Sequence, residues 1–131
     1  MQDLERARKF FAADRYATEV TGIEIVAVGE KYAKCVLPLD KRHKNALGHV
    51  MGGVPFTLAD FVFAVATNFD AVSPTVTTTS HITYLAPAQG DRLYGESKLL
   101  RDGKRNCYYE ITISDEQGTP VTIVMFCGTH L

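Results

Sequence analysis

The sequence is poor in several residue types, and each shortage argues against a class of protein. It contains no tryptophan and only three cysteines in 131 residues. The odd number and wide spacing of Cys35, Cys107 and Cys127 do not match the disulfide framework of a small secreted domain. None of the three shows a convincing helix start or cationic partner, the settings that activate a nucleophilic thiol. We therefore predict free, mostly buried thiols in a cytoplasmic protein.

An excess of charge of one sign is also lacking. Lys and Arg total 14 and Asp and Glu total 15, which gives a net charge of −1. Nucleic-acid binding usually requires a basic excess, so no nucleic-acid partner is expected. No basic segment precedes an apolar one near the start, so no signal peptide is expected, and the apolar run 54–69 is too short to span a membrane comfortably. These features predict one cytoplasmic domain over residues 1–131 with no membrane partner.

A single carboxylate interrupts the longest apolar segment. Residues 54–67 are apolar except for Thr57, Asp60 and Thr67, and this pattern predicts a helix buried on nearly every face. Burial without a partner penalises the charged form of a carboxylate. Asp60 is therefore a candidate catalytic group. The alternative is a structural acid whose carboxylate binds Thr57, Thr67 or a backbone group.

The segment before this helix, residues 43–53, is polar and contains glycine. Two adjacent glycines, Gly52 and Gly53, let a ligand approach the backbone without obstruction by side chains. Pro55 suits the first turn of a helix, where its missing N–H is no loss. The free N–H groups of the helix start are suited to binding an oxyanion.

The remaining pattern predicts an α+β fold. Helices are expected over residues 3–16 and 54–69, and strands over residues 22–28, 32–37, 76–85, 92–100, 106–114 and 121–127. Short turns, one with Asp102-Gly103 at its tip, predict a largely antiparallel meander of the last four strands. A helix that is apolar all round needs covering, and we expect a curved antiparallel sheet wrapped around it.

Segments 43–60 and 76–87 resemble the hotdog-fold acyl-CoA thioesterases of the phenylacetate (PaaI-type) branch. That branch shows His-x-Asn-x-x-Gly-x-x-His-Gly-Gly followed by an acid on the next helix. The matching residues are His43, Asn45, Gly48, Met51, Gly52, Gly53 and Asp60. Met51 stands where the family often has histidine, so any contribution of that imidazole is absent.

The resemblance implies a role for each matching residue. The Gly52 N–H would stabilise the oxyanion formed from a thioester carbonyl, and Asp60 would act as general base or nucleophile. Asn45 would position the water or the substrate, and Thr77, on the following strand, would bind the water or Asp60. His43, Met51 and Gly53 would contact the substrate. No metal and no cofactor other than the coenzyme A of the substrate would be needed.

The resemblance also implies that basic residues of a hairpin turn hold the phosphates of coenzyme A, here Arg101, Lys104 and Arg105. For several of these residues, a purely structural role stays open beside the functional one. Asn45 and Gly48 are also suited to ordinary turns, Thr77 to an ordinary strand and the three basic residues to solvated surface. A metal site at His43, His49 and His81 is disfavoured, because their spacing fits no familiar zinc pattern.

Spacing along the helix predicts an oligomer. Gly52 and Asp60 are eight residues apart, which is about 12 Å along a helix, so one chain cannot present both to one thioester carbonyl. Antiparallel helices of two protomers would bring them together, which predicts a two-fold homodimer. The resemblance implies the same, often with dimers paired as tetramers. The predicted function is hydrolysis of a small or medium acyl- or aryl-CoA. The alternatives are a non-catalytic acyl-CoA-binding protein and a dehydratase or hydratase, whose usual motifs are absent.

Overall fold

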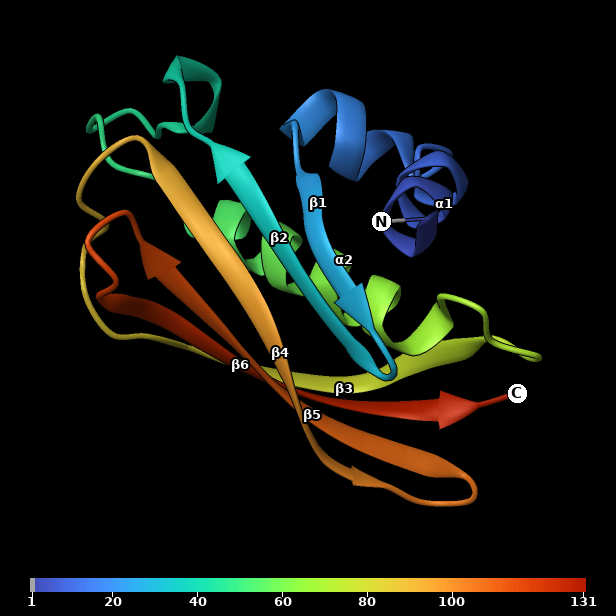
Figure 1. Ribbon diagram of the computed structural model, residues 1–131. Helices are drawn as coiled ribbons and strands as arrows, with labels where there is room; N and C mark the ends of the chain where they lie inside the picture. The colour runs from blue at the N-terminus through green and yellow to red at the C-terminus, as the bar shows by residue number, and fades with distance from the viewer. Residues whose placement is uncertain (1) are drawn as a thin grey trace.

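A long helix lies against one curved sheet of six antiparallel strands (Figure 1). The computed structural model describes residues 2–131. The strands are β1 (Glu24–Gly29), β2 (Tyr32–Pro38), β3 (Thr75–Tyr84), β4 (Arg92–Asp102), β5 (Asn106–Asp115) and β6 (Pro120–His130). The helical segments are α1 (Gln2–Phe11), the π-helix η1 (Tyr16–Thr21), the 3-10 turn η2 (Lys41–His43) and α2 (Gly53–Asn68). The predicted α+β architecture is thereby confirmed.

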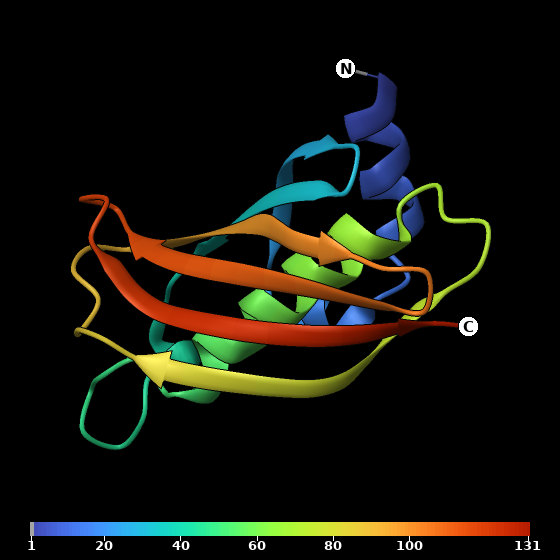
Figure 2. The same cartoon turned by 90° about the horizontal axis from the view of Figure 1, so that it is seen from below.

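The strand order is β1-β2-β4-β5-β6-β3. Strands β4, β5 and β6 are joined by hairpins and form the predicted meander. The prediction that all four last strands form one meander is wrong for β3, which pairs with β6 and not with β4. The connection after β3 therefore crosses to β4 on the far side of β5 and β6. As a result β3 forms an edge of the sheet (Figure 2), and nine of its ten residues are partly or fully exposed.

Helix α2 packs its apolar side onto the sheet. Leu58, Val62 and Val65 are fully buried, and Phe63 stacks on Phe126 of β6 with ring centroids 4.8 Å apart. The sequence pattern predicts a helix buried on nearly every face, and the structure shows that this prediction is wrong. Asp60 is exposed and Thr57 is half-buried. The outer side of α2 also carries few polar residues, although this chain does not fully cover that side.

The N-terminal segment covers the β1 end of the sheet and the adjoining part of α2. Phe11 is 4% exposed and packs edge-on against Phe61, with ring centroids 6.0 Å apart. Helix α1 ends at Phe11, earlier than the predicted end near residue 16. The chain then forms the π-helix η1, which ends at Thr21 and is followed by Gly22 in a left-handed conformation. Within residues 2–131, no helix combines the length and apolar character needed to cross a membrane.

Candidate active site

The loop between β2 and α2 is held together by the side chain of Asn45. Its Oδ1 accepts hydrogen bonds from the N–H groups of Leu47 (3.0 Å) and His49 (3.1 Å). Its backbone N–H donates to the His49 carbonyl at 2.7 Å. The predicted turn-forming role of Asn45 is therefore confirmed, because its side-chain oxygen binds two backbone N–H groups of the loop. A contact between its amide NH₂ and a substrate stays a prediction.

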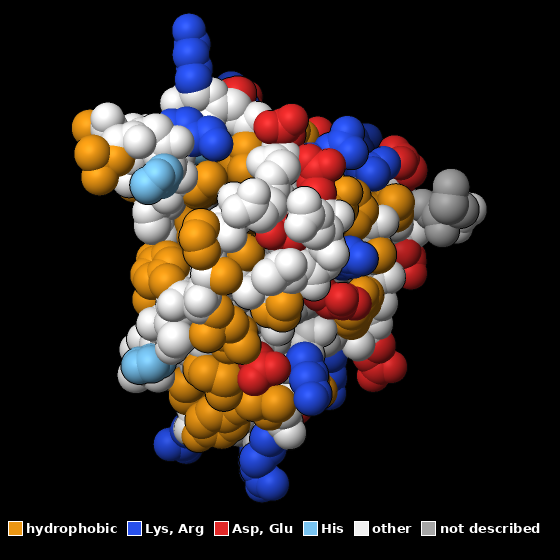
Figure 3. All heavy atoms as spheres, turned by 90° about the vertical axis from the view of Figure 1, so that its left-hand side faces the viewer, with side chains coloured by type: hydrophobic (Ala, Val, Ile, Leu, Met, Phe, Trp, Pro, Cys, Tyr) orange, Lys and Arg blue, Asp and Glu red, His pale blue; other side chains and the backbone are white. Residues whose placement is uncertain are grey.

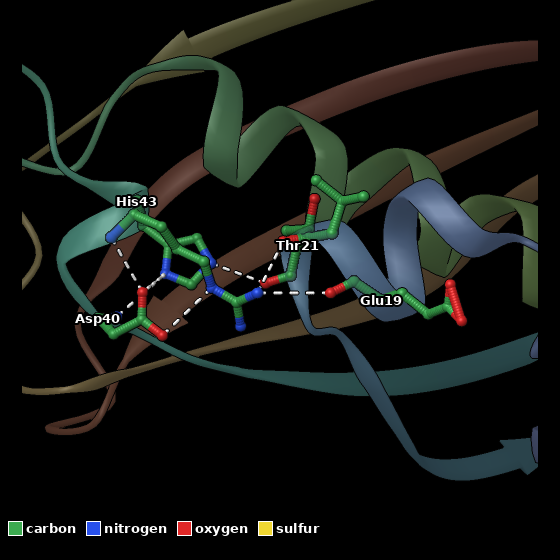
Figure 4. A network of polar contacts seen from close by, with 6 residues as sticks. Glu19, Thr21, Asp40 and His43 are labelled. Carbon is green, nitrogen blue, oxygen red and sulfur yellow. Dashed lines mark hydrogen bonds and ion pairs between the residues drawn. The ribbon is translucent and has the colours of Figure 1, made fainter.

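His43 has a structural role in this loop (Figure 4). Its side chain is 3% exposed. Nδ1 accepts a hydrogen bond from the Asp40 N–H at 3.0 Å, and Nε2 lies 2.7 Å from the Thr21 carbonyl oxygen. With Nδ1 accepting, Nε2 carries the proton and donates it to Thr21. Because both ring nitrogens bind backbone groups, the predicted contact of His43 with substrate has no support. His43 instead ties the loop to the end of η1.

Gly52 immediately precedes α2, where backbone N–H groups lack partners within the helix. The hydroxyl of Tyr84, at the end of β3, donates a hydrogen bond to the Gly52 carbonyl at 2.6 Å. A Cβ atom at position 52 would lie 3.0 Å from the Tyr84 oxygen, so only glycine fits without displacing the ring. Tyr84 was not predicted as a site residue, because no sequence pattern indicates that the end of this strand contacts the start of a helix 32 residues earlier.

A cavity of about 550 Å³ opens beside this helix start. Figure 3 shows this end of the molecule, where apolar side chains gather on part of the surface, with charged side chains both beside them and around the edge of the view. Asn45, Gly52 and Tyr84 line the cavity together with the segment 85–88. Met51 and Gly53 are exposed beside it. The cavity therefore combines the predicted oxyanion donor with an apolar wall.

Asp60 does not line that cavity. Its carboxylate reaches solvent, yet the surrounding protein partly desolvates it, and this, with a smaller contribution from the nearby charge of Asp14, raises its pKa. The alternative in which Thr57 or Thr67 binds Asp60 is wrong, because these hydroxyls donate to the helix carbonyls of Gly53 and Phe63. Within residues 2–131, no hydrogen bond or ion pair to the Asp60 carboxylate is found. An unpaired carboxylate with a raised pKa on an outer helix face is suited to acting as a base.

Thr77 is an exposed residue near the start of β3. It pairs with Gly128 of β6, so its side chain projects from the face of the sheet that packs on α2. A Cβ atom at Gly128 would lie 2.8 Å from the Phe63 ring, and Phe63 is within one helical turn of Asp60. A β-bulge follows at Thr78, whose hydroxyl donates to the Cys127 carbonyl. A role for Thr77 beside Asp60 stays a prediction.

The predicted site residues thus form two groups in one chain. Asn45 and Gly52 lie at the start of α2, and Asp60 lies farther along it, with Thr77 on strand β3, which contacts this helix. The basic hairpin lies farther still. Arg101, Lys104 and Arg105 are exposed at the β4–β5 turn, beside the end of α2, and the 16 residues of this helix separate its ends by about 24 Å.

Comparison with known proteins identifies the family. The sequence pattern of the thioesterase superfamily matches residues 47–122, more than half of the chain. The chain is 30% identical over 108 residues to the acyl-coenzyme A thioesterase PaaI of Escherichia coli, covering 82% of this chain and 75% of that protein. It is 26% identical over 105 residues to mouse (Mus musculus) acyl-coenzyme A thioesterase 13, covering 79% of this chain and 73% of that protein.

The solved structures agree with the sequence comparison. The structure of the PaaI protein from the phenylacetic acid degradation operon of E. coli aligns with a TM-score of 0.84 at 25% identity, over 98% of this chain and 96% of that chain. The sheet wrapped against a long helix is therefore the predicted hotdog fold. The chain belongs to the thioesterase superfamily and is a thioester hydrolase of its PaaI-type, hotdog-fold branch.

Proposed function

We propose that the protein hydrolyses small or medium acyl- or aryl-CoA thioesters to a free acid and coenzyme A. The observation that carries this proposal is Asp60, an unpaired carboxylate with a raised pKa and the one charged residue of α2. The relatives named acyl-coenzyme A thioesterase support the substrate class. The cytoplasmic location stays part of the proposal.

The chemistry needs only groups that this chain possesses. The thioester oxygen accepts a hydrogen bond from the Gly52 N–H, whose position at a helix start favours the developing negative charge. Asp60 takes a proton from water as the water oxygen attacks the carbonyl carbon. The tetrahedral intermediate then expels the coenzyme A thiolate, which gains a proton and leaves the acid. Direct attack by Asp60 to form a mixed anhydride, followed by its hydrolysis, gives the same products.

The two groups of site residues are brought together in this proposal by a two-fold homodimer. Strand β3 is an edge strand, and beyond Thr75, whose N–H and C=O bind the Asn68 side chain, its outer backbone groups can pair with another chain. Helix α2 contacts β3, and Asp60 is exposed on this helix. Antiparallel pairing of two chains through β3 and α2 would place the helix start of each beside the middle of the partner helix. The proposal extends to a tetramer formed by two such dimers.

The same arrangement gives the basic hairpin a place at the site. In an antiparallel pair, the hairpin at the end of α2 in one chain lies toward the start of α2 in the partner. Arg101, Lys104 and Arg105 form no ion pair within residues 2–131, so their charges are available for the phosphates of coenzyme A.

Thiol release from a panel of acyl-CoA thioesters tests the proposed function. Each substrate is compared with the matching S-acyl pantetheine, which keeps the thioester but lacks the nucleotide. We expect turnover of both, with a lower KM for the acyl-CoA. Tight binding of acyl-CoA without thiol release from any substrate would support the non-catalytic alternative.

Removing the hairpin charges supplies the control for this experiment. Replacement of Arg101, Lys104 and Arg105 by glutamine should raise the KM for acyl-CoA and leave that for acyl pantetheine unchanged. The difference should shrink as salt rises, because exposed charges are screened. Equal losses on both substrates would show that the hairpin does not contact the nucleotide.

Tyr84 is expected to position the Gly52 peptide. Tyr84→Phe removes the hydroxyl that binds the Gly52 carbonyl and keeps the ring in the cavity wall. One neutral hydrogen bond contributes about 0.5–1.5 kcal/mol, so kcat should fall about 2- to 10-fold, with KM nearly unchanged. Tyr108→Phe is the matched control, because Tyr108 is 41% exposed and lies outside this cavity. A rise in KM without a fall in kcat would contradict the positioning role.

A further inference from the structure

The sheet register places four chemically distinct side chains in a row across β4, β5, β6 and β3. Asp102 pairs with Cys107, and Cys107 pairs with Gly128. His130 is two residues beyond Gly128 in β6 and pairs with Thr75. Paired residues and residues two apart project from the same face of a sheet. Asp102, Cys107, His130 and Thr75 therefore share the face that packs on the end of α2.

Three members of this row converge. A carboxylate oxygen of Asp102, Sγ of Cys107 and a ring nitrogen of His130 all lie within 4.8 Å of one another. His130 Nε2 is 2.8 Å from Asp102 Oδ1, and His130 Nδ1 is 2.7 Å from Thr75 Oγ1. The side chains of Asp102 and His130 are 22% and 28% exposed, and Cys107 is 1% exposed. Each therefore has a restricted position.

Gly128 provides the space between Cys107 and His130. A Cβ atom at position 128 would lie 2.9 Å from Thr75 Cγ2 and 3.1 Å from Cys107 Sγ. Any other residue would press on both neighbours at once. Because Gly128 has no side chain, none stands between the Cys107 thiol and the His130 imidazole.

We propose that Asp102 Oδ1, Cys107 Sγ and His130 Nε2 bind a divalent metal ion of the zinc class. Thiolate, imidazole and carboxylate are the protein ligands of zinc, and three of them with an open fourth position are typical of sites that keep a water or another ligand. Two nitrogen or oxygen ligands of a tetrahedral zinc ion are about 3.4 Å apart, given bonds of about 2.1 Å. The His130–Asp102 contact has to open by less than an ångström.

The surroundings orient these ligands. With the metal on Nε2, the ring proton of His130 sits on Nδ1 and is donated to Thr75 Oγ1, the outer hydrogen bond that metal-binding histidines usually make. Lys31 Nζ lies 2.7 Å from Asp102 Oδ2 and leaves Oδ1 for the ion. Burial raises the pKa of the Cys107 thiol, so the ion has to displace the thiol proton into solvent.

A cavity of about 480 Å³, lined by Thr75, Asp102 and His130, opens the fourth position to a water or a small anion. It is bordered by Ala66 and Thr67 near the end of α2, whereas Gly52 precedes its start. The metal site thus lies at the other end of the helix from the proposed oxyanion donor of the same chain, and the hydrolysis described above has no step that uses it.

Metal titration of the purified protein tests this site without reference to hydrolysis. After treatment with a chelator, we expect one Zn²⁺ per chain and a rise in Tm on adding Zn²⁺, because an ion that binds only the folded state stabilises it. Co²⁺ in place of Zn²⁺ should give the near-ultraviolet charge-transfer absorption of a thiolate ligand. Cys107→Ser should abolish that absorption, and Cys127→Ser, which changes a thiol on the opposite face of β6, should keep it.

Two further variants decide the question if Cys107→Ser does not fold. Asp102→Asn removes a ligand charge from the rim of the site. Thr75→Val keeps the shape of the side chain and removes the partner of His130, which should weaken Zn²⁺ binding by about 10- to 100-fold. Unchanged Zn²⁺ affinity in both variants, failure of the unchanged protein to bind Zn²⁺, or Co²⁺ binding without thiolate absorption would overturn the proposal.

Discussion

Asp60→Asn is expected to lower the rate of acyl-CoA hydrolysis on the order of 10²- to 10⁴-fold, as for loss of a general base. The amide has the shape of the carboxylate but cannot take a proton from water or attack the thioester. The measurement is thiol release under saturating acyl-CoA. Turnover near that of the unchanged protein would remove Asp60 from the mechanism.

The folded protein should tolerate this change. Partial desolvation raises the pKa of Asp60 above its ordinary value, so the fold disfavours the ionised form. Stability from this group is therefore present at low pH and is lost as the pH rises through the raised pKa. Asn carries no charge, so Asp60→Asn should have a Tm equal to or above that of the unchanged protein at neutral pH. A large fall in Tm would mean that the lost activity reports unfolding.

Asp14→Asn is the matched control. The negative charge of Asp14 contributes to the raised pKa of Asp60, and its removal should lower that pKa. The acid limb of the kcat/KM profile reports the essential base of the free enzyme, so it should move to lower pH in this variant. Turnover at neutral pH should be retained.

Mixing two inactive variants should restore activity. Asp60→Ala and Asn45→Ala proteins are each expected to be nearly inactive, because every site in either homodimer lacks one group. In a hybrid dimer, one site takes Asn45 from one chain and Asp60 from the other and is complete, while the second site lacks both. Random pairing makes about half of the dimers hybrid, so on the order of a quarter of all sites should recover under two-fold symmetry.

The experiment requires unfolding and refolding the two variants together, with differently tagged chains to show that hybrids form. Each variant refolded alone is the control and should stay inactive. If tagged hybrids form and no activity returns, Asn45 and Asp60 act within one chain and the shared site is wrong. Asn45→Ala also removes the oxygen that binds Leu47 and His49, so Tm is measured for each variant before mixing.

Local patterns were sufficient to predict most of the helices and strands. The apolar segment after Pro55 forms α2 as far as Asn68, because a continuous apolar run of that length at helical spacing is strong evidence. The hairpin containing Asp102 and Gly103 also forms where predicted. The position of β3 was not predictable in this way. Pairing with β6 depends on strand contacts far apart in the sequence, while turns report only neighbouring elements.

The burial of side chains was the property that the sequence patterns predicted wrongly. The pattern of an apolar helix with a single charge predicts burial on nearly every side. The sheet covers only one side of α2, however, and Asp60 lies on the other. Likewise the histidine of the family motif, His43, matches its pattern, but the tertiary structure engages both of its ring nitrogens with backbone groups. A motif specifies which residue is present, whereas solvent and hydrogen-bond partners come from segments distant in the chain.

The sequence by itself determined the family, the fold class and the identity of the groups suited to thioester hydrolysis, because these rest on local patterns and on motif spacing. Only the tertiary structure decided which groups meet. Tyr84 reaches Gly52 across 32 residues, and Asp102, Cys107 and His130 converge from three strands. No periodicity records such contacts, since strand register and helix packing depend on the whole core. The structure also separates Asn45 and Gly52 from Asp60 along α2, the distance that a second chain has to bridge.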